Sequence, residues 1–209
     1  MLRKYLYGFA AFVLAFGILS ISILRSSLVN YAFAVSKSSP TPEAEQMPEV
    51  NYTMTLPGRV LPGSFLWPLK ALRDRVWYLL TFNHLKKAEL ALFFSDKRLV
   101  SGQSLFKDND PDLGLSTVAK GEKYLEMAVN EEEAARKGGQ NTSEFLAKLA
   151  AASLKHREII ENEIIPGAPE EARPYLSQLE VYSKTAFTKA SELLISSGKE
   201  SPKNPFEGQ

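Results

Sequence analysis

An uncharged stretch near the N-terminus constrains this chain more than any other feature. Tyr5 to Leu24 are twenty consecutive residues without a charged side chain. At a helical rise of about 1.5 Å per residue, such a segment reaches roughly 30 Å, the thickness of the hydrocarbon layer of a bilayer. Arg3 and Lys4 precede it, and basic residues on this side favour an N-terminus that stays inside the cell. We therefore expect residues 5–24 to enter the membrane and the rest of the chain to be exported.

Two fates are open for this N-terminal segment. If residues 1–34 are a signal anchor, the chain is a single-pass cell-membrane protein with an extracytoplasmic C-terminal domain. If they are a signal peptide, cleavage after Ala34, at the small-x-small triplet Ala32-Phe33-Ala34, releases a secreted protein. The uncharged run is longer than that of a usual signal peptide, and Arg25 interrupts the approach to the triplet. These two observations favour the anchor.

The charge balance of the remaining chain argues against nucleic acid as a partner. The chain has 25 Lys and Arg and 24 Asp and Glu, and Arg3, Lys4 and Arg25 are the only charged residues before residue 35. Removing these three leaves 22 basic residues against 24 acidic ones, a balance of −2. Binding to phosphate needs clustered Lys and Arg. The chain also has no cysteine, which excludes disulfides, thiolate nucleophiles and Cys-ligated metals.

The composition divides the remainder into three parts. Residues 35–56 hold three prolines among Ser, Thr, Glu and Gln, which is typical of a flexible linker. Residues 57–197 carry apolar residues at helical spacing, and no stretch alternates apolar and polar residues as a half-buried strand would. We expect them to form a helical domain. Residues 198–209 are polar, and we expect this tail to be disordered.

Capping and breaking residues predict five helices in the domain. Asn83 and Asp110 are good N-caps, and proline fits the first turn of a helix because its missing N–H is not needed there. Gly138-Gly139 is expected to end the third helix and Pro166-Gly167 the fourth. The helices are expected to start near Trp67, after Asn83 and after Asp110, and then to cover residues 143–165 and 170–196, with Pro174 as an alternative start of the last.

Each predicted helix has one apolar stripe, and short loops favour antiparallel packing of the helices. The expected fold class is all-α, an antiparallel bundle of about five helices. For the first helix, the sequence predicts a core-facing side and a solvent-facing side. The core-facing side consists of Leu72, Val76, Leu79 and Leu80, and the solvent-facing side of Arg73, Asp74 and Arg75.

Several short motifs resemble one bacterial family from Asn51 onward. They are Leu61-Pro62-Gly63, Leu66-Trp67-Pro68-Leu69-Lys70-Ala71-Leu72-Arg73-Asp74-Arg75, Lys86-Lys87-Ala88-Glu89-Leu90, Asp96-Lys97-Arg98-Leu99 and Ser116-Thr117-Val118-Ala119-Lys120-Gly121-Glu122-Lys123-Tyr124-Leu125. The family is known as domain of unknown function 5667, and the resemblance covers roughly residues 51–130. It implies an exported or membrane-anchored helical domain, and it implies no catalytic activity.

The opening motif also has a physical interpretation. Two Pro-Gly pairs, at residues 57–58 and 62–63, predict turns that bring the chain back across the bundle. Phe65, Leu66 and Trp67 would then close one end of it, while Lys70, Arg73 and Arg75 pair with Asp96 or Glu89. The alternative is a docking surface for a partner peptide or a cell-wall component. The candidate interaction or structural motif is Leu61, Pro62, Gly63, Trp67, Pro68, Lys70, Arg73 and Arg98.

No reaction or metal constellation is visible in the sequence. His84 and His156 have no second His or Cys at metal-ligand spacing, and we expect His156 to be exposed or half-buried in the middle of a helix. The motifs of serine hydrolases, phosphate-binding loops and zinc proteases do not occur. We therefore expect no catalytic residue, no cofactor and no metal.

The expected function follows from the anchor, the linker and the helical body. It is a non-catalytic, membrane-anchored structural or interaction module of the bacterial cell envelope. Its partners would be the membrane, through residues 5–24, and another envelope protein or a cell-wall component. The alternative is an extracytoplasmic sensor or regulator that binds a small ligand, a metal or a stressed protein within the bundle.

Overall fold

The computed structural model describes residues 50–207. The predicted membrane segment and most of the predicted linker lie outside the described residues. Over residues 50–207, no helix has both the length and the apolar character needed to span a bilayer. The described elements are five α-helices and one short π-helix: α2 (Trp67–Leu80), α3 (His84–Lys107), α4 (Pro111–Lys137), α5 (Ser143–Ile159), η1 (Ile160–Ile164) and α6 (Arg173–Ser196). The all-α fold class is confirmed for this part of the chain.

The predicted caps explain where the helices begin. The side chain of Asn83 accepts a hydrogen bond from the backbone N–H of Lys86 at 3.0 Å, and that of Asp110 accepts one from Leu113 at 3.3 Å. Such bonds satisfy N–H groups that have no partner within the helix. Proline occupies the first turn of α2, α4 and α6, so Pro174 marks the start of the last helix.

The predicted fourth helix changes character before its end. The α-helical pattern stops at Ile159, and η1 follows with a wider turn in which the N–H of Ile165 bonds to the carbonyl of Ile160 at 2.9 Å. A π turn adds one residue to the turn and so shifts the register of the side chains that follow. In this register Ile160 and Ile164 are both fully buried.

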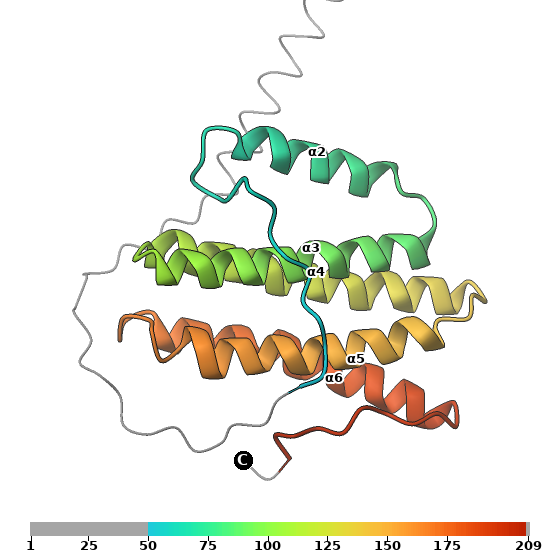
Figure 1. Cartoon of the computed structure of the whole chain (residues 1–209). Coiled ribbons are helices and arrows are strands. Elements are labelled where there is room, and N and C mark those ends of the chain that lie inside the picture. The colour runs from blue at the N-terminus through green and yellow to red at the C-terminus, as the bar shows by residue number, and fades with distance from the viewer. Residues whose placement is uncertain (1–49, 208–209) are drawn as a thin grey trace, which may run out of the picture. The chain divides into compact units, whose positions relative to one another are not determined.

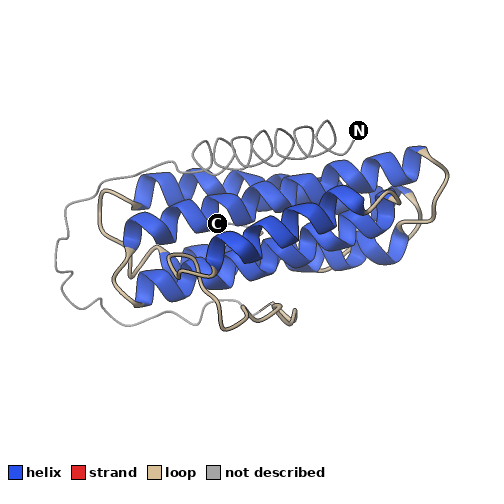
Figure 2. Ribbon diagram, turned by 90° about the horizontal axis from the view of Figure 1, so that it is seen from above, coloured by secondary structure: helices blue, strands red, loops and turns tan. Residues whose placement is uncertain are grey.

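The helices pack antiparallel in layers, as Figure 1 shows: α2 lies above the pair α3 and α4, which lies above the pair α5 and α6. Seen from above, the described helices run along one common direction (Figure 2). The core between the two helix pairs is built from small and medium apolar side chains. Its largest cluster includes Ala88, Ala91, Leu92, Leu125, Ala128, Leu149, Ala152, Ala186, Ala190 and Leu194.

Glycines allow α3 and α4 to approach each other closely. A Cβ atom on Gly102 would lie 2.5 Å from Cγ2 of Val118, and one on Gly121 would lie 3.1 Å from the backbone nitrogen of Leu99. Both distances are shorter than an ordinary van der Waals contact. The cost of glycine within a helix is therefore offset here by close packing of the two backbones.

Residues at both edges of the described part of the chain pack against the bundle. In the predicted linker, Val50 is buried against Leu154 of α5 and Phe206. In the tail, which was predicted to be disordered, Phe206 is only 3% exposed and the guanidinium of Arg157 lies 4.2 Å from its ring centroid. One aromatic side chain of the polar tail is thus placed against the bundle, which the composition of the tail did not predict.

Candidate functional site

The Leu61-Pro62-Gly63 motif forms a tight turn before α2. The backbone N–H of Ser64 donates to the carbonyl of Leu61 at 3.2 Å, and Gly63 has a φ of +88°. Proline followed by a residue with positive φ is the pattern of a type II turn, which favours glycine as the second of its two central residues. The turn predicted at residues 62–63 is thus confirmed, and it directs the chain into α2.

Trp67, Lys70 and Arg98 meet beneath the start of α2. The guanidinium of Arg98, which is buried, lies 4.2 Å from the centroid of the Trp67 ring, and Nζ of Lys70 lies 5.1 Å from it. Lys70 also donates to the carbonyl of Val60 at 2.8 Å. These contacts join α2, α3 and the preceding turn. The structure therefore places these three motif residues in a cluster that holds α2 on the bundle.

The ion pairs predicted between α2 and α3 are wrong for Asp96. Arg73 pairs instead with its neighbour Asp74, at 2.6 Å, and Lys70 bonds to backbone as described above. Asp96 turns away from α2 toward His156. The predicted plug is also wrong in part, because Phe65 is 95% exposed and Leu66 is exposed as well.

Polar and aromatic side chains fill the contact between α2 and the helices below. The Trp77 ring packs edge-on against Phe94 with centroids 6.0 Å apart, and the Tyr78 hydroxyl donates to Oε1 of Glu131 at 3.0 Å. Burial and the Glu131 carboxylate raise the pKa of the Tyr78 hydroxyl, so this donor stays protonated. Asp74, predicted to face solvent, is only 4% exposed.

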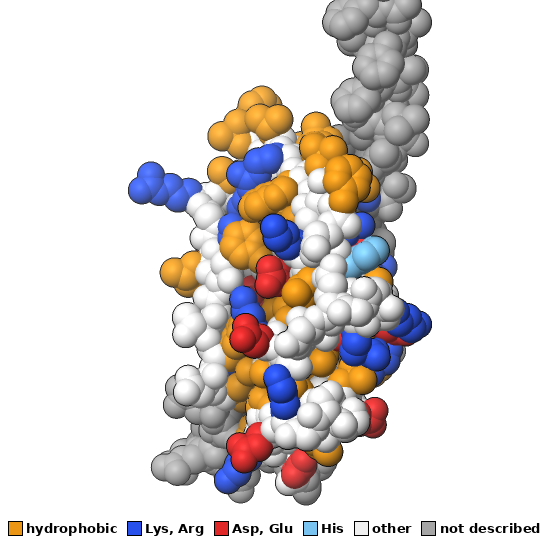
Figure 3. Space-filling view, turned by 90° about the vertical axis from the view of Figure 1, so that its right-hand side faces the viewer, with side chains coloured by type: hydrophobic (Ala, Val, Ile, Leu, Met, Phe, Trp, Pro, Cys, Tyr) orange, Lys and Arg blue, Asp and Glu red, His pale blue; other side chains and the backbone are white. Residues whose placement is uncertain are grey.

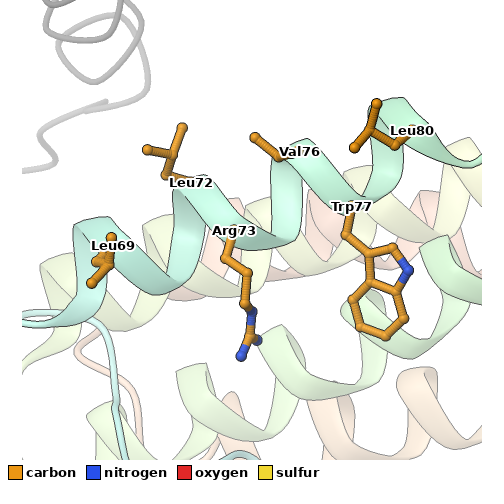
Figure 4. Close-up of a pocket in the computed structure, with 6 residues that line it drawn as sticks. All are labelled: Leu69, Leu72, Arg73, Val76, Trp77 and Leu80. Carbon is orange, nitrogen blue, oxygen red and sulfur yellow. The ribbon is translucent and has the colours of Figure 1, made fainter.

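The aliphatic side of α2 therefore points outward, opposite to the prediction. Leu72 is 40% exposed, Val76 is 42% exposed, and Leu79 and Leu80 are each 64% exposed. Figure 4 shows Leu72, Val76 and Leu80 rising from the side of α2 that is away from the bundle, whereas Trp77 points toward the helix below. Helical spacing correctly identifies an apolar stripe, but it does not say whether the stripe packs against the core or lies at the surface of the domain.

The exposed apolar side chains are concentrated on and around α2. Of the thirteen exposed large apolar residues among residues 50–207, ten lie between positions 56 and 82. We call this set the α2 face: Leu56, Phe65, Leu66, Leu69, Leu72, Val76, Trp77, Leu79, Leu80 and Phe82. Apolar side chains gather over α2 at the top of the molecule in Figure 3, with basic side chains next to them.

A groove runs along the α2 face. Its lining is almost entirely apolar and consists of Leu69, Leu72, Arg73, Val76, Trp77 and Leu80. A contiguous exposed apolar surface of this kind usually marks a place where a protein or a membrane binds. Of the candidate motif residues, only Arg73 lines the groove. Leu72, Val76 and Leu80 were predicted to face the core, because their spacing matches that of core residues.

A second notable cluster lies inside the bundle around His156. This side chain is fully buried, although the sequence predicted an exposed or half-buried position. Its Nδ1 lies 2.7 Å from Oε1 of Glu122, and its Nε2 lies 3.2 Å from Oδ1 of Asp96. The hydroxyl groups of Tyr52 and Thr55 donate to Oδ2 of Asp96 at 3.0 and 3.2 Å. The prediction failed because the partners of His156 come from other helices.

The cluster holds a charged histidine. Burial alone lowers the pKa of His156, but the Glu122 and Asp96 carboxylates outweigh that effect and raise it to about 9. Both ring nitrogens then donate, which suits two carboxylates at these distances. No group of three or more His, Asp and Glu within residues 50–207 has the arrangement needed to hold a metal ion. The cluster links α3, α4 and α5 to the segment that carries Tyr52.

His84 lies on the surface near the end of α2. Its Nδ1 is 2.7 Å from Oε2 of Glu131, and Nζ of Lys87 is 3.1 Å from the other oxygen of that carboxylate. Glu131 also accepts from Tyr78, so it connects α2, α3 and α4. This arrangement explains His84 as a structural contact.

One family model matches the chain, that of domain of unknown function (DUF5667), over residues 59–168. The matched range contains the turn at Leu61–Ser64, the Trp67 cluster, all of α2, and Asp96, Glu122 and His156, and it continues beyond residue 130, where the recognised resemblance ends. Neither the curated proteins nor the solved structures include a match.

Proposed function

Taking as a premise that the chain belongs to the family domain of unknown function (DUF5667), whose model covers more than half of it, we propose that the protein is a non-catalytic interaction module of the bacterial cell envelope. In this proposal residues 5–24 anchor the chain in the membrane, and the helical domain lies on the extracytoplasmic side. The domain binds another envelope component through the α2 face.

The orientation of α2 is the observation that carries this proposal. Leu72, Val76 and Leu80 form a stripe on the outer side of the helix (Figure 4), while Asp74 is buried. Exposing a leucine or valine instead of burying it costs about 1.5 to 3 kcal/mol for each side chain. An apolar stripe that the bundle leaves uncovered is therefore expected to be covered by a partner.

The contacts beneath α2 support the same conclusion. Arg98 below Trp67 and Glu131 beside Tyr78 fix the helix in the orientation that displays the stripe. The motif residues Trp67, Lys70 and Arg98 are thus assigned to positioning the surface, and the residues that touch the partner are the aliphatic ones between them.

The alternative, a sensor with a ligand inside the bundle, has less support. The groove that the structure describes lies along α2 at the surface of the molecule, and all six of its lining residues belong to that helix. Between the helix pairs, the space around His156 is taken up by the side chains of Glu122, Asp96 and Tyr52. We therefore favour binding at the surface.

Site-specific crosslinking in cells tests the proposal. A photoreactive benzophenone amino acid is introduced at Leu72, and as a matched control at Val181, an exposed apolar residue of α6. Irradiation of intact cells is expected to join position 72 to an envelope component and to give several-fold less product at position 181. Equal labelling of the two positions, or turnover of an envelope substrate by the purified protein, would overturn the proposal.

A further inference from the structure

The α2 face has the features of a helix that lies in a lipid surface. We infer that the component covering it is the membrane itself, at a surface that carries anionic headgroups. This inference rests on the proposed function and names the partner of the same surface.

Basic residues border the apolar stripe on both sides. At about 100° per residue around a helix, Leu72, Val76 and Leu79 lie on one side of α2, with Arg73 at one edge of it and Arg75 at the other. Both arginines are exposed. Arg73 pairs with Asp74, and its guanidinium points toward the helix below (Figure 4). This leaves Arg75 as the long basic side chain that reaches lipid headgroups while the stripe enters the acyl region.

The whole segment around α2 is positively charged. Residues 51–82 contain four basic residues and one acidic residue, an excess of three positive charges. The acidic residue is Asp74, which is buried and paired with Arg73. No acidic side chain of this segment is therefore displayed to the partner. Each basic residue near an anionic membrane surface adds attraction of about 1 kcal/mol, so the charge complements anionic lipid.

Aromatic residues near α2 suit the same environment. Trp77 is half exposed, and Phe65 and Phe82, which flank the helix, are 95% and 84% exposed. Tryptophan is enriched at the boundary between headgroups and acyl chains because its ring is apolar and its N–H is polar. These side chains extend the apolar surface beyond both ends of α2.

The chain outside the described residues is long enough for this orientation. The predicted membrane span ends at Leu24, and the described chain begins at Val50, which packs against α5. The 25 residues between them can reach at most about 90 Å. From the layer of α5 and α6 to α2 there are two helix spacings of about 8–10 Å each. A chain of 25 residues is therefore long enough for α2 to lie against the membrane.

A second copy of the chain fits the α2 face less well. Two such faces packed together would bring Arg59, Arg73 and Arg75 of one copy toward those of the other, with no exposed acidic residue of residues 51–82 to balance them. Like charges placed together in an interface oppose association. The same positive edge attracts an anionic bilayer.

The two tryptophans of the chain make the inference directly measurable. Trp67 and Trp77 are the only ones in the sequence, and both lie in α2. The full chain is reconstituted into vesicles of phosphatidylcholine with or without phosphatidylglycerol, in which the acyl chains carry bromine. Trp67→Phe leaves Trp77 as the single reporter; if that variant fails to fold, the chain with both residues serves, because both report on α2.

Three results are expected. Brominated lipid quenches the fluorescence of Trp77 in vesicles with phosphatidylglycerol, and this quenching falls when salt is raised. Leu72→Glu reduces the fraction of molecules whose α2 lies in the lipid about tenfold. That figure corresponds to the loss of one buried leucine. Val181→Glu, an equivalent change on α6, leaves the quenching unchanged. Circular dichroism of each variant verifies that the helices are intact.

The inference is overturned if quenching is absent, if it is equal in neutral and anionic vesicles, or if Leu72→Glu and Val181→Glu behave alike. A failure of this inference is distinguishable from a failure of the proposed function. If Trp77 is not quenched by lipid but position 72 crosslinks to a protein in cells, the interaction module stands and its partner is that protein. If position 72 reacts with nothing, both fail.

Discussion

Glu122 of α4 and His156 of α5 meet in the interior of the bundle, with Oε1 and Nδ1 2.7 Å apart although 34 residues separate them in the chain. Both side chains are fully buried. On the opposite edge of the imidazole, Asp96 brings in α3 at 3.2 Å. The histidine thus connects α3, α4 and α5. The α2 face lies on a bundle whose stability is expected to depend on this contact.

The stability of the domain is expected to fall as the pH rises from about 6.5 to about 9. The pKa of His156 is raised to about 9 in the folded state, against an ordinary value of 6.5 for an unfolded chain. Between these values the folded state holds a proton that the unfolded state has lost, so raising the pH favours unfolding. The stabilisation is fully present below pH 6.5, and up to about 3 kcal/mol is lost by pH 9. Urea unfolding across this range measures it; a flat or rising profile would contradict the assignment.

Replacing His156 alone is expected to lower the stability of the domain more than replacing all three side chains of the cluster. His156→Leu leaves the carboxylates of Asp96 and Glu122 buried without their cation, which should destabilise the domain by about 3–5 kcal/mol. A triple variant that also carries Asp96→Leu and Glu122→Met removes the unpaired charges and should recover part of that loss. Urea midpoints compare the two variants. A triple variant less stable than His156→Leu would show that the cluster stabilises through its carboxylates independently of the histidine.

The sequence predicts the helices well because their ends depend on local chemistry. Asn83 and Asp110 cap α3 and α4 in the structure, and prolines begin α2, α4 and α6. A cap involves residues only three or four positions apart, so it is visible in a short stretch of sequence.

The buried cluster could not be predicted in the same way. Asp96, Glu122 and His156 are separated by tens of residues, and their meeting depends on the register of three helices. The direction of the α2 stripe was missed for a different reason. Leu72 and Val76 have the spacing of core residues, and the stripe faces outward because Trp67, Trp77 and Tyr78 on the other side of α2 contact the helices below.

Gly102→Ala is expected to destabilise the domain even though alanine favours helices. The added Cβ would lie 2.5 Å from Cγ2 of Val118 and 3.1 Å from the carbonyl oxygen of Gly114. Separating α3 from α4 should cost about 1–3 kcal/mol. Gly167→Ala is the matched control, because its Cβ has no neighbour closer than 3.9 Å. Thermal unfolding of the two variants is compared, and similar melting temperatures would indicate that α3 and α4 have room to separate.

Phe206→Ala is expected to release the C-terminal tail and weaken the domain by about 2–4 kcal/mol. Its ring is buried against Val50 and Leu154, and a large buried aromatic residue usually costs 3–5 kcal/mol to truncate, less where the site can relax. Phe82→Ala, at a position that is 84% exposed, should change stability by less than about 0.5 kcal/mol. Hydrogen exchange of the backbone near Val50 gives a second readout. Equal stability of the two variants would mean that the tail is not held as described.

The absence of cysteine from the chain permits the most direct test of the account, which is thiol labelling of single-cysteine variants in intact cells. Val181→Cys and Leu72→Cys are treated with a small maleimide that does not cross membranes, before and after the membrane is dissolved in detergent. The account predicts that Val181→Cys is labelled in intact cells, and that Leu72→Cys is protected there and labelled once detergent removes the membrane. If Val181→Cys is labelled only after the cells are broken, the domain does not lie outside the membrane. If Leu72→Cys is labelled as readily as Val181→Cys in intact cells, nothing covers the α2 face.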